Sequence, residues 1–140
     1  MEKIEFKILT KDLLELNLDD LIFIDNQAFG IDAWGEDNFR YQLPQKYDLS
    51  FLVKIDDELI AYCINSKKEE DCYIHRIVIK KVYKGLGLGG EMINYIQNQL
   101  NQRKIRLKVN VNNVFAINFY FKMHFRIDSI HSEYYTMKRI

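Results

Sequence analysis

The segment from residue 85 to residue 90 constrains this chain more than any other, because it holds four of the six glycines. It reads GLGLGG, follows the apolar run Ile77–Ile79, and precedes a stretch with apolar residues at helical spacing. Consecutive glycines let backbone N–H groups turn toward an anion, and the start of a helix adds unsatisfied donors and a positive dipole end. An ordinary strand-to-helix turn needs fewer glycines. The segment therefore predicts an anion-binding loop between a strand and a helix.

Two common nucleotide-binding motifs fit this loop poorly. Gly85, Gly87 and Gly90 satisfy G-x-G-x-x-G, but a dinucleotide site needs the first glycine directly after the strand and an acid about 20 residues later. Here KKVYK intervenes, and the next strand offers Lys108 and Asn110 instead of an acid. A P-loop ends in Gly-Lys-Ser/Thr, whereas this loop ends in Gly-Gly-Glu. The loop is therefore expected to bind an anionic ligand other than a dinucleotide or a P-loop nucleotide.

Composition narrows the class of protein. The 140 residues suffice for one domain, which we expect to span residues 1–140, and 48% of them are hydrophobic. Twenty basic residues balance twenty acidic ones, which gives no field for nucleic acid or anionic membranes. No apolar run reaches the ~20 residues of a membrane span, and the N-terminus does not resemble a signal peptide. Cys63 and Cys72 form neither a disulfide framework nor a metal site. We expect a cytoplasmic protein without nucleic-acid or membrane partners and without a metal.

Periodicity predicts the order β-α-α-β-β-β-α-β-α-β-β, an α/β (α+β) layer fold. Thr10 is the expected N-cap of a helix that ends at Gly30, and a second helix is expected from Glu36 to Leu43. Strands are expected at residues 4–8, 49–55, 59–66, 72–79 and 105–111, with a closing pair in 125–140. Further helices are expected after the glycine loop and after Asn113.

Two segments resemble motifs of one family. KGLGLG at residues 84–89 looks like motif A, [QR]-x-x-G-x-[GA], of the GNAT superfamily of N-acetyltransferases, with Lys84 in place of Arg or Gln. NNVFAINFYFKMHF at residues 112–125 resembles motif B, N-x-x-A-x-x-x-Y-x-x-x-G-F, with His124 in place of Gly. QAFGIDAW at residues 27–34 faintly resembles the substrate-side helices of RimI-type enzymes. The likeness covers nearly the whole chain in element order and is specific from about Ile74 to Phe125.

The resemblance implies a mixed, mostly antiparallel sheet flanked by helices, and acetyl-CoA as the acetyl donor. In the family the glycine loop binds the pyrophosphate, and the preceding strand pairs with the pantetheine arm. The implied cofactor-binding residues are Ile77, Val78, Ile79, Lys84, Gly85, Leu86, Gly87, Leu88, Gly89, Gly90 and Asn113.

The resemblance also implies catalytic roles. Tyr120 matches the family's general acid. A core aromatic on an amphipathic helix would give the same pattern, but the register of Tyr120 with Asn113 favours the catalytic role. The backbone N–H of Val78 or Ile79 is the expected oxyanion donor. RimI-type enzymes carry a Glu twelve residues before this Tyr, where this chain has Lys108, which cannot accept a proton while it is charged. His75 is the alternative base because imidazole titrates near neutrality, but it also fits a packing role, and a water chain could replace it.

The expected reaction is direct transfer of an acetyl group to a primary amine, either a protein N-terminus or a small molecule. Lys108 is the expected acceptor-binding residue and would favour amines that also carry an anion. One alternative is a catalytically silent CoA-binding module that acts as a sensor or interaction protein, and another is a domain that binds NAD or ATP. The sequence leaves open whether the protein is a monomer or a homodimer, with residues 125–135 as a possible dimer edge.

Overall fold

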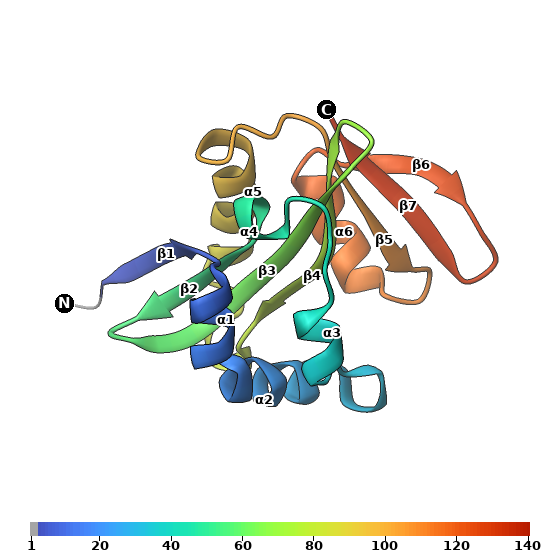
Figure 1. Ribbon diagram of the computed structural model, residues 1–140. Coiled ribbons are helices and arrows are strands. Elements are labelled where there is room, and N and C mark those ends of the chain that lie inside the picture. Colours follow the sequence, from blue (N-terminus) through green and yellow to red (C-terminus); the bar gives the residue numbers. More distant parts are fainter. Residues whose placement is uncertain (1–2) are drawn as a thin grey trace.

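Seven strands form one sheet in the computed structural model, which describes residues 3–140 (Figure 1). The strand order is β1-β2-β3-β4-β5-β7-β6, and every neighbouring pair is antiparallel except β4 and β5. This confirms the predicted mixed and mostly antiparallel sheet. The strands are β1 (Ile4–Ile8), β2 (Phe51–Ile55), β3 (Glu58–Lys68), β4 (Asp71–Ile79), β5 (Ile105–Asn110), β6 (Arg126–Ile130) and β7 (Tyr134–Arg139).

Helices cover both faces of the sheet. The helices are α1 (Lys11–Leu16), α2 (Leu18–Phe29), α3 (Glu36–Arg40), α4 (Lys46–Leu49), α5 (Leu88–Asn98) and α6 (Val114–Lys122), with short 3-10 turns η1 (Gly30–Asp32) and η2 (Lys81–Tyr83). One apolar cluster joins α5 and α6 to one face through residues such as Met92, Ile96 and Ile117. A second cluster joins α1, α2 and α3 to the other face through Leu14, Leu21 and Phe39. The sheet therefore separates two layers of helices.

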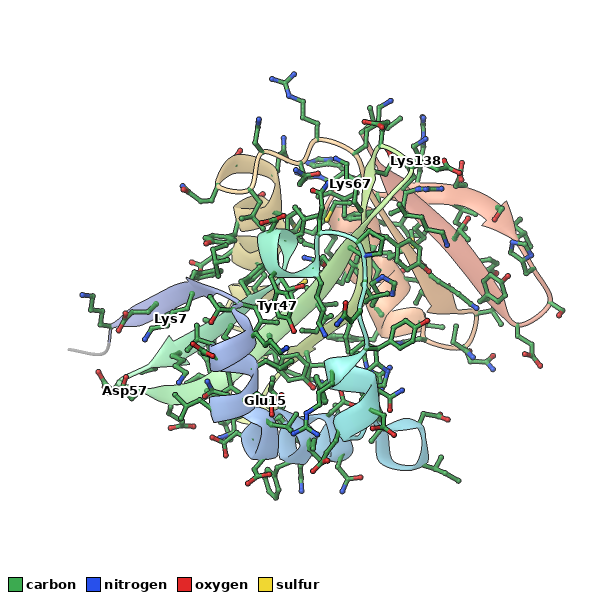
Figure 2. All side chains as sticks on the ribbon, viewed as in Figure 1. Lys7, Glu15, Tyr47, Asp57, Lys67 and Lys138 are labelled. Atoms are coloured by element: carbon green, nitrogen blue, oxygen red, sulfur yellow. The ribbon has the colours of Figure 1, made fainter. Side chains whose placement is uncertain are left out.

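The parallel strands β4 and β5 stay together only at one end. They pair at three positions, Cys72 with Ile105, Tyr73 with Arg106, and Ile74 with Leu107. Beyond Ile74 the strands diverge, and Figure 1 shows the two halves of the sheet spreading apart toward the bottom of the view. Lys67 and Lys138, labelled in Figure 2, lie at the joined end, whereas Asp57 lies at the tip of the β2–β3 hairpin. The divergence leaves one edge of β4 unpaired between residues 75 and 79.

The N-terminal helix differs from the prediction. Thr10 is its N-cap, as expected, and accepts a hydrogen bond from the Leu13 N–H at 3.0 Å. The single helix expected up to Gly30 is instead α1 and α2, with a break at Asn17. The buried Asn17 amide donates to the Leu13 carbonyl at 2.9 Å, which favours termination of the helix at that point.

The segment before β2 also differs from the prediction. Helix α3 ends at Arg40 rather than at residue 43, because Tyr41 takes extended backbone angles. A short helix, α4, includes Leu49, which the sequence analysis assigned to a strand. Inside α4 the buried Lys46 donates hydrogen bonds to the carbonyls of Phe39 and Tyr41, and burial lowers its pKa. These bonds tie α4 to the end of α3.

Candidate active site

The glycine loop connects β4 to α5 through residues 80–87. Gly85 and Gly87 have φ values of +79° and +85°, a region that side chains strongly disfavour. A Cβ at Gly87 would meet nothing within 4 Å, so the loop borders open space there. The first N–H groups of α5 have no partner within the helix, since its first backbone bond is donated by Glu91 to the Gly87 carbonyl. The loop can therefore cradle an anion at the start of α5.

Helix α6 packs directly against the first turn of α5. A Cβ added at Gly89 would lie 3.0 Å from the Phe119 ring and 3.6 Å from the Ile79 side chain. A larger residue at position 89 would therefore crowd the point where the end of β4, the start of α5 and the middle of α6 meet. Asn113 is the N-cap of α6, and its side-chain oxygen accepts from the Ala116 N–H at 3.2 Å.

Tyr120 projects from α6 into the apolar cluster between α6 and the sheet. Its side chain is 8% exposed and contacts the rings of Phe119 and Phe125. No hydrogen bond to its hydroxyl is found among residues 3–140. Burial away from water raises the pKa of Tyr120 above its ordinary value, and the nearby Cys63 thiol adds a smaller increase. The hydroxyl is therefore protonated at neutral pH and has a proton to donate.

A cleft of about 630 Å³ lies on the side of the sheet opposite α6, next to the divergence of β4 and β5. Four parts of the chain that are distant in sequence form it: the η1–α3 segment, the middle of β4, the end of β5, and the β6–β7 turn. Its lining residues are Asp32, Trp34, Tyr73, Ile74, His75, Arg76, Lys108, Asn110, Glu133 and Tyr134. The cleft brings together His75 and Lys108, both of which the sequence analysis selected.

His75 occupies a bulge in β4. Ile64 of β3 pairs with Arg76 and Asn65 pairs with Ile74, so that His75 is the extra residue. The half-buried His75 ring shares a hydrogen bond of 2.7 Å between Nε2 and the Ser66 hydroxyl. Desolvation, with smaller contributions from Lys68 and Lys46, lowers the pKa of His75. The imidazole is therefore neutral at pH 7 and able to accept a proton.

Lys108 lies on the exposed face of β5, and its ammonium stands 3.9 Å from the centroid of the Tyr134 ring. This cation–π contact holds the side chain at the cleft wall. Two acidic residues, Asp32 and Glu133, line the same cleft, so the charged residues around Lys108 are not all positive.

The sequence analysis missed an ion pair beside the cleft. Asp25 is fully buried and accepts from the Trp34 N–H at 2.7 Å and from the Tyr62 hydroxyl at 2.7 Å. It also pairs with Arg76, which lines the cleft. Desolvation, followed by the bond to Asp25, raises the pKa of Tyr62, so this hydroxyl remains a donor. A signal was present: Asp25 follows Leu18, Leu21 and Ile22 on the apolar stripe of α2, where an acid requires a buried partner.

Three further observations concern the described residues 3–140. Among them, no group of three or more His, Cys, Asp or Glu side chains is arranged to hold a metal ion. No helix in this part of the chain has the length and apolar character to cross a membrane. Both cysteines are free and buried, and burial raises the pKa of Cys72 to about 12.

Comparison with known proteins gives a family and a fold. The family model described as the Acetyltransferase (GNAT) family matches residues 12–125. A protein of Methanocaldococcus jannaschii, named as an uncharacterized N-acetyltransferase, is 32% identical over 89 residues. That alignment covers 61% of this chain, which spans only 57% of the relative's length.

Solved structures match over almost the whole chain. The ribosomal-protein-S18-alanine N-acetyltransferase of Escherichia coli has a TM-score of 0.78 and 18% identity, with 99% of this chain and 93% of that chain covered. The PaiA N-acetyltransferase of Thermoplasma acidophilum, solved in complex with coenzyme A, has a TM-score of 0.74 and 16% identity, with 98% of each chain covered. At these identities the likeness establishes the fold.

Proposed function

Because this chain belongs to the acetyltransferase (GNAT) family, we propose that it transfers an acetyl group from acetyl-CoA to a primary amine. The observation that carries the proposal is the divergence of β4 and β5 between two sites, the glycine loop with α6 on one side and the cleft on the other. A donor bound on one side can meet an acceptor bound on the other through this gap.

The residues around the glycine loop fit the cofactor. Unpaired N–H groups at the start of α5, with Lys84 to Gly90, suit a pyrophosphate, because they combine backbone donors with the positive end of a helix. The unpaired edge of β4 at Ile77, Val78 and Ile79 offers backbone groups to an extended pantetheine arm. Asn113, at the start of α6, completes the proposed binding residues. When bound, acetyl-CoA supplies a thioester whose carbonyl carbon is open to attack by an amine.

Each catalytic role goes to a group whose protonation state suits it. The N–H of Ile79 would donate to the carbonyl oxygen that gains negative charge. The Lys80 N–H donates to the Ile60 carbonyl, and the alternation of the antiparallel ladder also turns the Val78 N–H toward β3, so Val78 is the weaker of the two expected donors. Tyr120 would hold a proton at its hydroxyl for the departing sulfur, and its raised pKa keeps that proton in place. His75 would accept a proton from the amine, either directly or through water, since it is neutral and lines the cleft. Lys108 would contact the acceptor.

The test is release of free thiol from acetyl-CoA in the presence of a pooled panel of amines. The panel should include peptides with free N-termini, polyamines and amino-acid amides. Amine-dependent thiol release supports the proposed transferase. Calorimetric binding of acetyl-CoA without thiol release for any amine would instead identify a silent CoA-binding module. Binding of NAD or ATP without binding of CoA would overturn both readings.

A further inference from the structure

Arg76 is fixed at the wall of the cleft by a carboxylate behind it. Its Nε donates to Asp25 Oδ2 at 3.1 Å and its Nη2 donates to Asp25 Oδ1 at 3.0 Å. Asp25 is itself fully buried and held by Trp34 and Tyr62. Because the Asp25 carboxylate is buried and hydrogen-bonded, its bidentate interaction with Arg76 has a fixed position and direction.

Aromatic rings and a carbonyl restrain the same guanidinium. Its central carbon lies 3.7 Å from the centroid of the Phe29 ring and 4.9 Å from that of Trp34. Its Nη2 also donates to the Asp32 carbonyl at 2.8 Å. Arginine in such a setting has little freedom left to lose when it binds a further group.

One amino group of Arg76, Nη1, has no hydrogen-bond partner in the part of the chain that the structure describes. The guanidinium is planar, so bonding Asp25 through its Nε–Nη2 edge directs Nη1 away from that carboxylate. No hydrogen bond to Nη1 is found among the described residues, and the side chain lines the cleft. Because Asp25 balances its charge, Arg76 here offers a donor within a neutral pair, which suits an uncharged oxygen.

We propose that Nη1 of Arg76 donates a hydrogen bond to a carbonyl oxygen next to the reacting amine, which makes Arg76 a specificity-determining residue for the acceptor. This inference rests on the proposed function. Arg76 directly follows His75, the proposed base, and both line the cleft. Because both residues line one cleft, an amine bound at His75 can direct its neighbouring atoms toward Arg76. Amines without such an oxygen would leave Nη1 without this bond.

The test compares two ligands, alaninamide and isopropylamine, which carry the amine on similar carbons and differ by a carboxamide in place of a methyl group. Trp34 is the only tryptophan in the chain and lines the cleft, so its emission reports binding without turnover. In the presence of CoA, the wild type should bind alaninamide at least about tenfold more tightly than isopropylamine, the scale of a hydrogen bond to a charged group. Arg76→Lys keeps a charge beside Asp25 but lacks the second amino group, and should reduce this preference to about twofold or less.

A matched control is Arg40→Lys. Arg40 pairs with Glu15 at 2.8 Å and with Glu36 at 3.1 Å, away from the cleft lining, and this variant should keep the wild-type preference. If Arg76→Lys does not fold, the pair Asp25→Asn with Arg76→Gln removes both charges and avoids an isolated buried carboxylate. A structural role alone would weaken both ligands equally and leave their ratio unchanged.

Calorimetry with acetyl-CoA on the same preparations separates the two proposals. No binding of acetyl-CoA would overturn the proposed function. Three results would overturn the role of Arg76 alone, provided that acetyl-CoA binds. They are equal affinities for the two amines, no saturable response to alaninamide, and an intact preference for alaninamide in Arg76→Lys.

Discussion

At the scale of single residues, Tyr120 combines near-complete burial with a hydroxyl that has no hydrogen-bond partner among residues 3–140. Tyr120→Phe keeps the ring and its contacts with Phe119 and Phe125, so the free energy of unfolding should change little. If the hydroxyl is the general acid, kcat should fall by about 10²–10⁴. The measurement is steady-state thiol release, together with the Kd for acetyl-CoA, which should hold. Wild-type turnover in the variant would leave Tyr120 with a packing role only.

His75 predicts a pH dependence. Its pKa is lowered, so the neutral base persists below the ordinary value of about 6.5, and kcat/KM should fall only as the pH drops further. The ratio of wild-type to His75→Gln activity cancels the ionisation of the acceptor, and this ratio should decrease toward acid pH. A ratio that does not depend on pH would favour a water chain without His75.

Stability must be followed in the same experiment. A histidine whose pKa is lower in the folded state binds more protons when unfolded, so its contribution to stability is lost as the pH falls below about 6.5. Thermal unfolding of wild type at each pH shows how much of the lost activity reflects unfolding rather than protonation of the base.

The residues of the candidate site divide by how they can be found in a sequence. Local motifs identify the glycine loop, Asn113 and Tyr120. In the structure the loop precedes α5, Asn113 caps α6, and Tyr120 lies within α6. Asp25 and Arg76 are 51 positions apart, and no local pattern links them. The misplaced acid on the apolar stripe of α2 signals that a partner exists, but only the packing of α2 across β3 and β4 identifies Arg76.

At the scale of elements, the bulge in β4 decides which side chains reach the cleft. Before it, Cys72 and Ile74 face the α5–α6 layer, and after it Ile77 and Ile79 do. The extra residue shifts the alternation by one position, so Arg76 and Val78 turn to the other face. The run CYIHRIVI carries this phase shift in its apolar residues. A strict two-residue period predicts the strand correctly and assigns its second half to the wrong face.

The contact between α5 and α6 yields a prediction for Gly89. In Gly89→Ala the new Cβ would lie 3.0 Å from the Phe119 ring, so the ring or the first turn of α5 must shift by a few tenths of an ångström. Overpacking of this kind costs about 1–3 kcal/mol, and the displaced first turn of α5 should weaken acetyl-CoA binding. Gly90→Ala is the matched control for stability, because its Cβ would meet Met123 at an ordinary 3.5 Å. Equal unfolding temperatures for the two variants would contradict this account.

At the scale of the whole molecule, the sheet separates the two proposed binding sites. The glycine loop and Tyr120 belong to the layer of α5 and α6, whereas His75, Arg76 and Lys108 line the cleft on the opposite side. The gap between β4 and β5 is where the two sites approach each other. The element order predicts a mixed α/β layer fold, and the resemblance to the GNAT family implies the mostly antiparallel sheet. The gap depends on where pairing stops, which no local pattern in β4 or β5 specifies. Substitutions on one side should therefore alter one ligand and spare the other.

A substitution of Lys108 can test this separation, because Lys108 lies on the cleft side of the sheet. The charged residues that line the cleft are Asp32, Arg76, Lys108 and Glu133, and Lys108 carries the one ammonium among them. Lys108→Glu turns that charge negative beside two carboxylates, so the cleft should attract polyamines and aminoglycosides and lose acceptors that carry a carboxylate. The measurement is competition between two peptides that differ by Glu or Gln at the second position, with a polyamine as the third acceptor. The ratio of kcat/KM values should move at least about tenfold toward the polyamine, since a charge pair is exchanged for a repulsion. The Kd for acetyl-CoA should remain at the wild-type value. An unchanged ratio would mean that Lys108 only packs on Tyr134. A changed Kd for acetyl-CoA would mean that a substitution in the cleft also affects the cofactor site on the other side of the sheet.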